Sequence, residues 1–405
     1  MIDLDDIRAA GVLLAGVAER TPLIQSSTFS RLTGSDLFLK AENMQRTGSF
    51  KIRGAYVRIA RLSPQERAKG VIAASAGNHA QGVAVAASVA RIPAVVVMPE
   101  FASIAKVTAT RSYGAEVVLN GRAYDDAYTS ARKLQKERGL TFVHPFDDWD
   151  VIAGQGTVGL EILEDLPDAD AIVVPVGGGG LIAGVAIAAK TLRPDTKVIG
   201  VQAAGAPSCY ESFKRGHLAH SEKLTTIADG IAIKSCGHLT FPVIKRLVDD
   251  IVIVEDDAIV HAIVTLLERC KLLVEAAGAV GLAALLTGKL KLPGQKVAVV
   301  LSGGNIDVNL LARVIEHGLT AAGRYTILRA RLRDEPGQLL GLLKIVAEKK
   351  ANIVDVAHHR FGLPLSVNEA EVELTIETRD PEHSAQILRA LLEAGYEVTR
   401  EGMGG

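Results

Sequence analysis

Residues 171–184 read AIVVPVGGGGLIAG, an apolar run that passes through four consecutive glycines into an alanine-containing apolar stretch. A short, continuous apolar run is typical of a β-strand that is buried on both faces. Four adjacent glycines cost backbone entropy and gain nothing in a plain turn. The order strand, glycines, helix therefore predicts a turn whose backbone N–H groups surround a phosphate at a helix N-terminus.

The tetraglycine segment taken alone leaves one alternative open. GGGGLIAG overlaps a loose GxGxxG pattern, so a dinucleotide-binding fold competes with a simple phosphate site. No Lys-Ser or Lys-Thr pair follows the glycines, which argues against a P-loop and against nucleoside triphosphate hydrolysis.

Similar apolar runs recur on both sides of this segment. They occupy residues 71–74, 94–98, 116–119, 171–175, 197–201 and 296–301. Helical stretches such as 82–91 and 123–138 separate them. We interpret each run as a strand that is buried on both faces. Buried strands that alternate with helices predict an α/β fold, with a parallel sheet covered by helices on both sides.

The pattern changes after residue 323. A half-exposed strand is predicted at 325–332, then the turn DEPGQ at 334–338 and a helix near 339–349. Two strands (352–359 and 370–377), a helix (381–394) and a last strand near residue 397 are predicted to follow. This βαββαβ order predicts a ferredoxin-like domain. We expect the boundary near residues 317–323.

Composition limits the classes of partner. The 405 residues carry a formal net charge of -1 and only 4% aromatic residues, which does not favour nucleic acid or an anionic membrane. Three scattered cysteines without CxxC spacing predict a reducing compartment, no disulfide framework and no zinc site. The acidic start MIDLDD and the lack of a long uncharged apolar run predict a cytoplasmic protein.

Three further turns carry polar groups after apolar runs. Residues 47–51 read TGSFK, where Thr47–Ser49 are predicted to cap a helix that begins near Phe50. Lys51 then lies in the first turn, whose positive end lowers the pKa of the amine and favours nucleophilic attack. For an isolated lysine, a solvated surface position is the simpler interpretation.

The other two turns are residues 74–82, ASAGNHAQG, and residues 301–307, LSGGNID. In the first, backbone N–H groups at a helix start suit a carboxylate or a phosphate, and the amide of Asn78 suits a phenolate-type oxygen. The alternative is a plain helix cap. The second turn is common and is weak evidence by itself.

In this order and spacing, SFKIRGA, SAGNHAQG, GGGGLIAG and SGGNID resemble the threonine dehydratase family of fold type II pyridoxal-phosphate enzymes, which are similar to the tryptophan synthase β-chain. The resemblance covers about residues 5–315. It implies a catalytic domain over residues 1–318, made of two parallel-sheet subdomains, with the small one at about 53–155. Residues 324–405 resemble an ACT domain, a regulatory module that binds ligands and self-associates.

The resemblance implies pyridoxal 5'-phosphate as cofactor and assigns roles to these residues. Lys51 would bind the cofactor as an imine and remove the substrate α-proton. Ser75 and the amides of residues 76–79 would hold the substrate carboxylate. The residues expected to bind the cofactor are Phe50, Lys51, Asn78, Gly177, Gly178, Gly179, Gly180 and Ser302, and those expected to bind substrate are Ser75, Ala76, Gly77, Asn78 and His79.

Two of these residues bear on the type of reaction. Ser302 would face the pyridine nitrogen, and a hydroxyl there does not keep that nitrogen protonated as an aspartate would, which favours elimination over transamination. Ala76 replaces a serine of serine racemases and cannot transfer a proton. The resemblance therefore implies dehydration and deamination of L-threonine, and of L-serine, to a 2-oxo acid and ammonia, with the cofactor phosphate as the expected proton donor to the leaving hydroxyl.

The alternatives are a serine racemase, a lyase for another β-hydroxy amino acid, or a ligand sensor built on an inactive enzyme. His144 is interpreted as a satisfied loop histidine. His358 and His359 are adjacent in a predicted strand and point to opposite faces, so no shared metal ion is expected. Glu275 is an acid in the apolar helical run 271–281 and needs a partner, which makes the cofactor edge a candidate neighbour, but it is not counted among the site residues. Asp229 and Gly230 are a candidate for a cation site, which the sequence leaves open.

The partners implied are an amino-acid substrate and an amino-acid effector, isoleucine or valine, near residues 334–338. A homodimer or homotetramer is also implied. A dimerisation module without a ligand is the alternative for the C-terminal domain.

Overall fold

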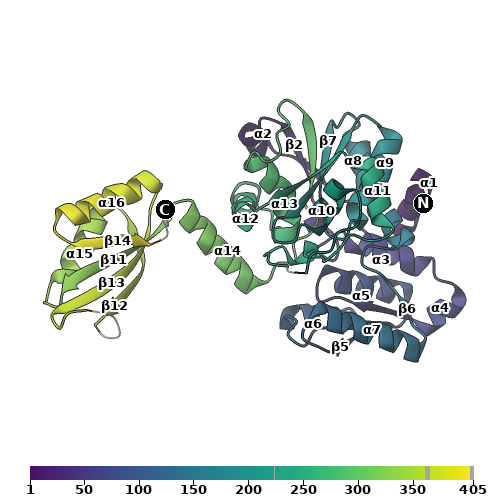
Figure 1. Ribbon diagram of the computed structural model, residues 1–405, viewed down its shortest axis with the longest axis horizontal. Helices are drawn as coiled ribbons and strands as arrows, with labels where there is room; N and C mark the ends of the chain where they lie inside the picture. Colours follow the sequence, from purple (N-terminus) through teal and green to yellow (C-terminus); the bar gives the residue numbers. More distant parts are fainter. Residues whose placement is uncertain (223, 361–364, 402–405) are drawn as a thin grey trace. The chain divides into compact units, whose positions relative to one another are not determined.

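The computed structural model describes residues 1–222, 224–360 and 365–401 (Figure 1). It contains two compact units, Met1–Val308 and Asn309–Gly405. Each unit has its own hydrophobic core, and the two are described separately below.

The larger of two sheets in the first unit has six strands. Its order is β1 (Leu23–Gln25), β2 (Asp36–Lys40), β10 (Lys296–Val300), β7 (Ala171–Pro175), β8 (Lys197–Ala203) and β9 (Asp250–Val254). Strand β1 runs antiparallel to β2, and the other pairs are parallel. The second sheet is entirely parallel, in the order β5 (Glu116–Leu119), β4 (Ala94–Met98), β3 (Val71–Ala74) and β6 (Thr141–Phe142). The predicted α/β fold with parallel sheets is confirmed.

Helices cover these sheets and connect their strands. The helices of the first unit are α1 (Leu4–Leu14), α2 (Ser27–Thr33), α3 (Lys51–Ala60), α4 (Pro64–Lys69), α5 (Asn78–Ala90), α6 (Ile104–Ser112), α7 (Tyr124–Arg138), α8 (Trp149–Asp165), α9 (Gly180–Leu192), α10 (Ser208–Arg215), α11 (Thr240–Leu247), α12 (Asp256–Cys270) and α13 (Ala276–Leu286), with the 3-10 turns η1 (Glu42–Met44) and η2 (Asp229–Ile231). Figure 1 shows α5, α6 and α7 around the smaller sheet.

The alternation of side chains in β3 shows why this strand is buried on both faces. Val71 and Ala73 belong to a core that includes residues of α3 and α5. Ile72 and Ala74 point to the other face, into a core that includes residues of α7. The prediction of two buried faces is wrong for β5, where Glu116 and Leu119 are exposed. This strand lies at the edge of its sheet and has a neighbour on one side only.

A network of buried charges holds the start of α3. The Arg53 guanidinium, 1% exposed, donates to both carboxylate oxygens of Glu42 at 2.8 Å and to those of Glu161 at 2.5 and 2.9 Å. Lys40 Nζ donates to Glu161 and to the Thr21 carbonyl, both at 2.6 Å. Each buried charge therefore has an opposite charge beside it, which a buried ion needs.

Cys209 and Cys236 form a disulfide, with Cα atoms 5.3 Å apart, and Cys270 is free. The prediction that the cysteines form no disulfide is wrong for this pair. Cys209 lies in α10 and Cys236 in the loop before α11, and the packing of these elements brings together residues that are 27 positions apart. Sequence spacing alone does not reveal such a contact.

Helix α14 (Val308–Ala321) begins at the last residue of the first unit and continues into the second. The other elements of the second unit are β11 (Tyr325–Arg333), α15 (Gln338–Glu348), β12 (Asn352–His359), β13 (Glu369–Glu377), α16 (Pro381–Glu393) and β14 (Glu397–Glu401). Its sheet is antiparallel, in the order β12, β13, β11, β14. One face packs on α15 and α16 through Leu328, Leu342, Leu374 and Ile387. The predicted βαββαβ order is confirmed.

Arginines of β11 stand opposite glutamates of β13. Arg329, Arg331 and Arg333 pair in register with Glu373, Glu371 and Glu369, and Arg329 Nε lies 3.0 Å from Glu373.

Within residues 1–222, 224–360 and 365–401, none of the helices combines the length and hydrophobicity needed to cross a bilayer.

Candidate active site

Four turns of the first unit meet at one cavity of about 730 Å³. The first turn comes after β2 and η1, and the other three come after β3, β7 and β10. Each turn therefore lies at or near the carboxyl end of a strand. This edge is where open α/β sheets bind ligands. The cavity lining includes Phe50, Lys51, Ser75, Ala76, Gly77, Asn78, His79, Gly177, Gly178, Gly179, Gly180 and Ser302. The structure therefore brings together all the residues that were selected from the sequence.

Lys51 is the first residue of α3, and its side chain is half-buried at the cavity wall. Lys51 Nζ donates a hydrogen bond to the Pro145 carbonyl at 3.0 Å and lies 5.0 Å from the centre of the Phe50 ring. Burial lowers the pKa of Lys51 to about 8, and the Glu275 carboxylate opposes that shift. The pKa is lowered as expected, but burial is the main cause.

The predicted cap of α3 by residues 47–49 is wrong. Phe50 is the N-cap residue, and its side chain makes no capping hydrogen bond. The Thr47 hydroxyl donates instead to the Ser49 carbonyl at 3.3 Å. Residue 49 also forms a β-bridge with Gly303, which turns this segment toward the end of β10.

The glycine turn after β7 packs closely against neighbouring residues. Gly179 has φ of 96°, in the left-handed region that favours glycine, and it is the N-cap residue of α9. A side chain on Gly178 would overlap the Phe146 ring, and one on Gly179 would meet Thr240 and Ile244. The turn therefore presents only backbone to the cavity. The first amides of α9 have no acceptor within the helix, so the turn fits the phosphate of pyridoxal phosphate.

Asn78 belongs to a chain of side-chain amides that crosses the site. Its Nδ2 donates to Glu275 at 2.7 Å, and its Oδ1 accepts from Asn305 Nδ2 at 2.8 Å. Asn305 Nδ2 also donates to the Thr47 carbonyl at 2.7 Å. Asn78 is thus held at the cavity wall, with its position set by residues from two other turns.

Glu275, a candidate neighbour of the cofactor that was not counted among the site residues, lines the cavity. Burial raises the pKa of Glu275 to about 7, and the Asp229 carboxylate adds to this rise. The hydrogen bond from Asn78 opposes it. An acid inside the apolar segment 272–286 was the available signal, because such a group needs a partner.

The turn after β3 places Ser75, Ala76 and Gly77 before α5. Gly77 N donates to Ser75 Oγ at 3.2 Å, and helix α5 begins at Asn78. His79 is buried, and its Nε2 lies 2.9 Å from the Val143 carbonyl. Burial lowers the pKa of His79 to about 3, and the nearby Lys51 adds to the effect. His79 is therefore neutral and held by the protein.

Ser302 follows β10, is 3% exposed, and lines the cavity. Its carbonyl accepts from Phe50 N at 3.2 Å, which connects this turn to the residue before Lys51. The turn at residues 301–307, which is weak evidence in the sequence, thus contacts the residue that precedes Lys51.

His144 is a loop histidine with its polar contacts satisfied, as predicted. Its Nδ1 accepts hydrogen bonds from Asp147 N at 2.8 Å and Phe146 N at 3.3 Å. Burial lowers the pKa of His144 to about 4. The described part of the chain holds no cluster of three or more His, Cys, Asp or Glu side chains that suits a metal ion.

Two ion pairs cross the rim between the smaller sheet's helices and the rest of the unit. Lys106 of α6 lies 3.1 Å from Asp229, and Lys234 lies 2.5 Å from Asp125 of α7. All four residues line the cavity. Asp229, which the sequence left open as part of a cation site, is thus an ion-pair partner of Lys106 at the cavity mouth.

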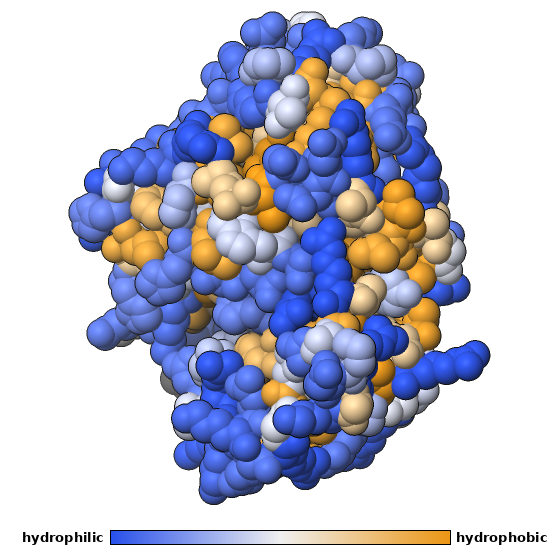
Figure 2. All heavy atoms as spheres, turned by 90° about the vertical axis from the view of Figure 1, so that its right-hand side faces the viewer, coloured by the Kyte–Doolittle hydropathy of each residue, from blue (hydrophilic) through white to orange (hydrophobic). Residues whose placement is uncertain are grey.

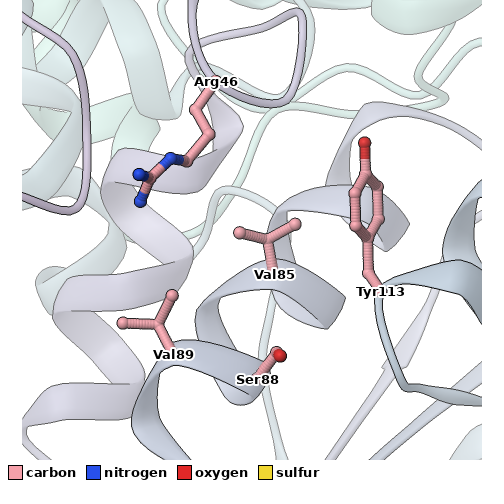
Figure 3. Close-up of a pocket in the computed structure, with 5 residues that line it drawn as sticks. All are labelled: Arg46, Val85, Ser88, Val89 and Tyr113. Carbon is pink, nitrogen blue, oxygen red and sulfur yellow. The ribbon is translucent and has the colours of Figure 1, made fainter.

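A second pocket, of about 300 Å³, is lined by Arg46, Val85, Ser88, Val89 and Tyr113 (Figure 3). Figure 3 shows three of these residues on one helix, α5, with Arg46 and Tyr113 on either side of it. This second pocket shares no lining residue with the larger cavity.

Comparisons with known proteins agree with this geometry. Residues 14–303 match the model of the pyridoxal-phosphate dependent enzyme family. An L-threonine ammonia-lyase of Thermotoga maritima is 52% identical over 398 residues, 98% of this chain and 99% of that protein. One of Geobacter sulfurreducens is 51% identical over 379 residues, 94% of each.

Solved structures resemble more than three quarters of this chain. A threonine deaminase from Solanum lycopersicum is 40% identical, with a TM-score of 0.73 over 78% of this chain and 89% of its own. Maize serine racemase is 38% identical, with a TM-score of 0.74 over 79% of this chain and 98% of its own. Because a family model matches most of the chain and long relatives share half of its residues, the chain belongs to the pyridoxal-phosphate dependent enzyme family.

Proposed function

We propose that this protein is an L-threonine ammonia-lyase that converts L-threonine to 2-oxobutanoate and ammonia, and L-serine to pyruvate and ammonia. One observation carries the proposal: the amine of Lys51, with its lowered pKa, shares a cavity with the glycine turn 177–180, Asn78 and Ser302. Relatives about half identical over nearly the whole chain, named L-threonine ammonia-lyases, support it.

The residues present fit pyridoxal 5'-phosphate. Residues 177–180 would bind the phosphate, Phe50 would lie beside the ring, and Asn78 would bond its phenolic oxygen. Ser302 would face the ring nitrogen. When bound, the cofactor supplies an electron-withdrawing ring that stabilises negative charge at the substrate α-carbon.

Lys51 is the proposed base. A group with a pKa of about 8 has a neutral fraction near neutral pH, and its amine can take the α-proton. The Pro145 carbonyl accepts a hydrogen bond from the amine and helps to fix its direction. Lys51 would also carry the cofactor covalently between turnovers.

The turn after β3 is the proposed carboxylate site. The N-terminus of α5 offers backbone N–H groups and a positive helix end to an anion. Ser75 stands at the cavity wall beside those amides, and the amides of residues 76–79 complete the set. This arrangement would hold the substrate with its α-proton toward Lys51.

Ser302 and Ala76 favour elimination. A serine hydroxyl does not hold a proton on the ring nitrogen, so negative charge at the α-carbon is better used to expel the β-hydroxyl. Ala76 lines the cavity but offers no proton to the opposite face of the substrate. A one-sided site favours a dehydratase over a racemase, although serine racemases share the fold.

The first test is a panel of β-hydroxy amino acids: threonine, serine, 3-hydroxyaspartate and phenylserine. We expect 2-oxo acid and ammonia in equal amounts, with the highest kcat/KM for threonine. Formation of the D-enantiomer without loss of total amino acid would instead identify a racemase. A higher kcat/KM for another member of the panel would contradict the threonine assignment.

The second test locates the covalent link. Borohydride reduction of the holoenzyme should attach the cofactor mass to the peptide that contains Lys51. Lys106 lines the same cavity and should remain unlabelled, which makes it an internal control. Lys51→Ala should lower kcat by at least about a thousandfold. Labelling at another lysine would contradict the proposed role.

We also propose that the second unit is an ACT-type regulatory module that binds isoleucine or valine near Asp334–Gln338. Its βαββαβ order and antiparallel sheet support this. Deleting residues 324–405 should abolish any response of the rate to these amino acids and spare the cofactor site. Inhibition by isoleucine that persists after the deletion would refute it.

We infer that the protein is a homodimer or homotetramer. Figure 2 shows hydrophobic patches among hydrophilic surface on one face of the molecule. Exposed apolar side chains in the chain include Val12 and Leu32 in the first unit and Leu340 and Val356 in the second. Large exposed apolar patches are typical of contacts between subunits. Analytical ultracentrifugation tests this, and a monomer at micromolar concentration would contradict it.

A further inference from the structure

The glycine turn is supported from behind by the start of α11. The Gly178 carbonyl accepts hydrogen bonds from Thr240 Oγ1 at 2.7 Å and from Gly237 N at 3.1 Å. Thr240 is fully buried. The direction of this carbonyl is therefore set by two donors that lie outside the glycine turn.

A peptide group is planar and trans, so its C=O and N–H point in opposite directions. The described chain has no cis peptide bonds. Because the Gly178 carbonyl points toward α11, the N–H of Gly179 in the same peptide group points away from α11. The start of α11 thus decides the direction of one amide in the glycine turn.

Helix α11 receives its cap from a distant residue. Its N-cap residue, Leu239, has no side chain that can accept a hydrogen bond. The Asp147 carboxylate accepts instead from the backbone N–H groups of His238 at 3.0 Å, Leu239 at 2.8 Å and Thr240 at 3.3 Å. A carboxylate at this end of a helix satisfies unpaired donors and opposes the positive end of the dipole.

Asp147 belongs to the same segment as two residues of the cavity wall. The Pro145 carbonyl accepts the hydrogen bond from Lys51 Nζ. The Phe146 ring fills the space where a side chain on Gly178 would lie. One carboxylate therefore connects the segment that contacts Lys51 with the helix that orients the glycine turn.

We propose that Asp147 and Thr240 are positioning residues that act through the Gly178–Gly179 peptide group to aim an amide at the cofactor phosphate. The cavity lining includes neither side chain. The inference rests on the proposed phosphate site at residues 177–180 and adds a second layer of residues to it.

The first test is Thr240→Val, which keeps the shape of the side chain and removes its hydroxyl. Loss of one buried hydrogen bond should raise the cofactor Kd of the holoenzyme by about tenfold, measured by equilibrium dialysis. The ³¹P resonance of the bound phosphate should also shift, because the direction of one amide in the glycine turn has changed. Thr240→Ser restores the hydroxyl and should return the Kd to within about twofold of wild type.

A double-mutant cycle tests whether Asp147 acts through the same link. Asp147→Asn keeps the side-chain volume and removes the charge and one acceptor oxygen. The Kd of the double variant Asp147→Asn/Thr240→Val should rise by less than the product of the two single effects, because both act on one peptide group. Independent, multiplicative effects would overturn the inference, as would an unchanged Kd in Thr240→Val.

Asp148→Asn is the matched control. Asp148 is the neighbouring residue and also caps a helix, accepting from Asp150 N at 2.8 Å and Val151 N at 3.3 Å at the start of α8. Weakening this cap should lower thermal stability to about the same degree as Asp147→Asn does, and should leave the cofactor Kd within about twofold of wild type. If Asp148→Asn weakened the cofactor as much as Asp147→Asn, a general loss of stability would explain both, and the positioning role would be rejected.

The two levels of proposal fail in different ways. If wild-type protein did not bind the cofactor, or bound it away from residues 177–180, the proposed function would fail. If wild-type protein bound it there and Thr240→Val behaved as wild type, only the positioning role would fail.

Discussion

Lys51 and Glu275 line the same cavity, and burial shifts the pKa of each in the direction that favours its neutral form. The pKa of Lys51 falls to about 8 and that of Glu275 rises to about 7. Removing water from a charged group favours its neutral form, whichever sign the charge has. A base and an acid with pKa values near neutrality are typical of sites that move protons.

Glu275 should make the stability of the cofactor-free protein depend on pH. Its pKa is about 7 when folded and near its ordinary value of 4.5 when unfolded. The folded state therefore binds more protons between these values, so this stability is present below pH 4.5 and is lost as pH rises through 7. Glu275→Gln should increase the free energy of unfolding at pH 8 by up to roughly 3 kcal/mol, and much less at pH 5.

Urea unfolding of wild type and Glu275→Gln at the two pH values measures this difference. A gain of equal size at pH 5 and pH 8 would show that Glu275 does not titrate between them.

Gly178 should tolerate no side chain. A methyl group there would overlap the Phe146 ring, so Gly178→Ala should cost about 1–3 kcal/mol of stability through crowding. The control is Gly11→Ala, because a methyl group on Gly11 would meet only Thr157 Cγ2 at 3.9 Å and neither Gly11 nor Gly178 has a positive φ. Cofactor absorbance and thermal unfolding should both change in Gly178→Ala. Normal cofactor binding in this variant would mean that the Phe146 ring moves aside freely.

At the scale of elements, the position of Lys51 depends on how α3 is held. Arg53, two residues further along, joins α3 to η1 and α8 through Glu42 and Glu161. Burial raises the pKa of Glu42, but the Arg53 guanidinium lowers it further, so the net pKa lies below its usual value. The ion pair thus favours the charged form of a wholly buried carboxyl group, and its stabilisation is lost as pH falls through that lowered pKa.

Arg53→Ala should destabilise the protein by about 3–5 kcal/mol, because it leaves buried carboxylates without their partner. The control is Arg8→Ala, which removes an exposed pair with Asp5 and should cost no more than about 1 kcal/mol. Chemical denaturation measures both. Equal costs would show that the buried network contributes no more than a surface pair.

At the scale of the whole molecule, the two units have separate cores. The core of the second unit draws on residues from Leu328 to Val398 and shares none with the cores of the first. Every residue that lines the large cavity belongs to the first unit. The cavity is therefore complete without the second unit.

Residues 1–323 should fold alone and bind pyridoxal phosphate with unchanged affinity, because their core and cavity are intact without the rest. The visible absorbance of the bound cofactor and a cooperative thermal transition measure this. An unfolded or cofactor-free fragment would show that the first unit depends on the second.

Local patterns in the amino-acid sequence by themselves determined much of this protein. The strands at 71–74 and 171–175, the turn at 177–180 and the candidate Lys51 follow from apolar runs and glycines that are adjacent in the chain. The βαββαβ order after residue 323 was predictable for the same reason. Such signals depend on neighbouring residues and on the periodicity of side chains, so a sequence displays them directly.

Only the tertiary structure decided the contacts between distant residues. Such contacts include the hydrogen bond between Asn78 and Glu275, the cap that Asp147 gives to α11, and the Cys209–Cys236 disulfide. The tertiary structure also decided that β5 lies at an exposed edge of its sheet. Each depends on which elements become neighbours when the sheets are covered. The physical reason is that burial and long-range hydrogen bonds are properties of packing, and no local pattern in the chain specifies them.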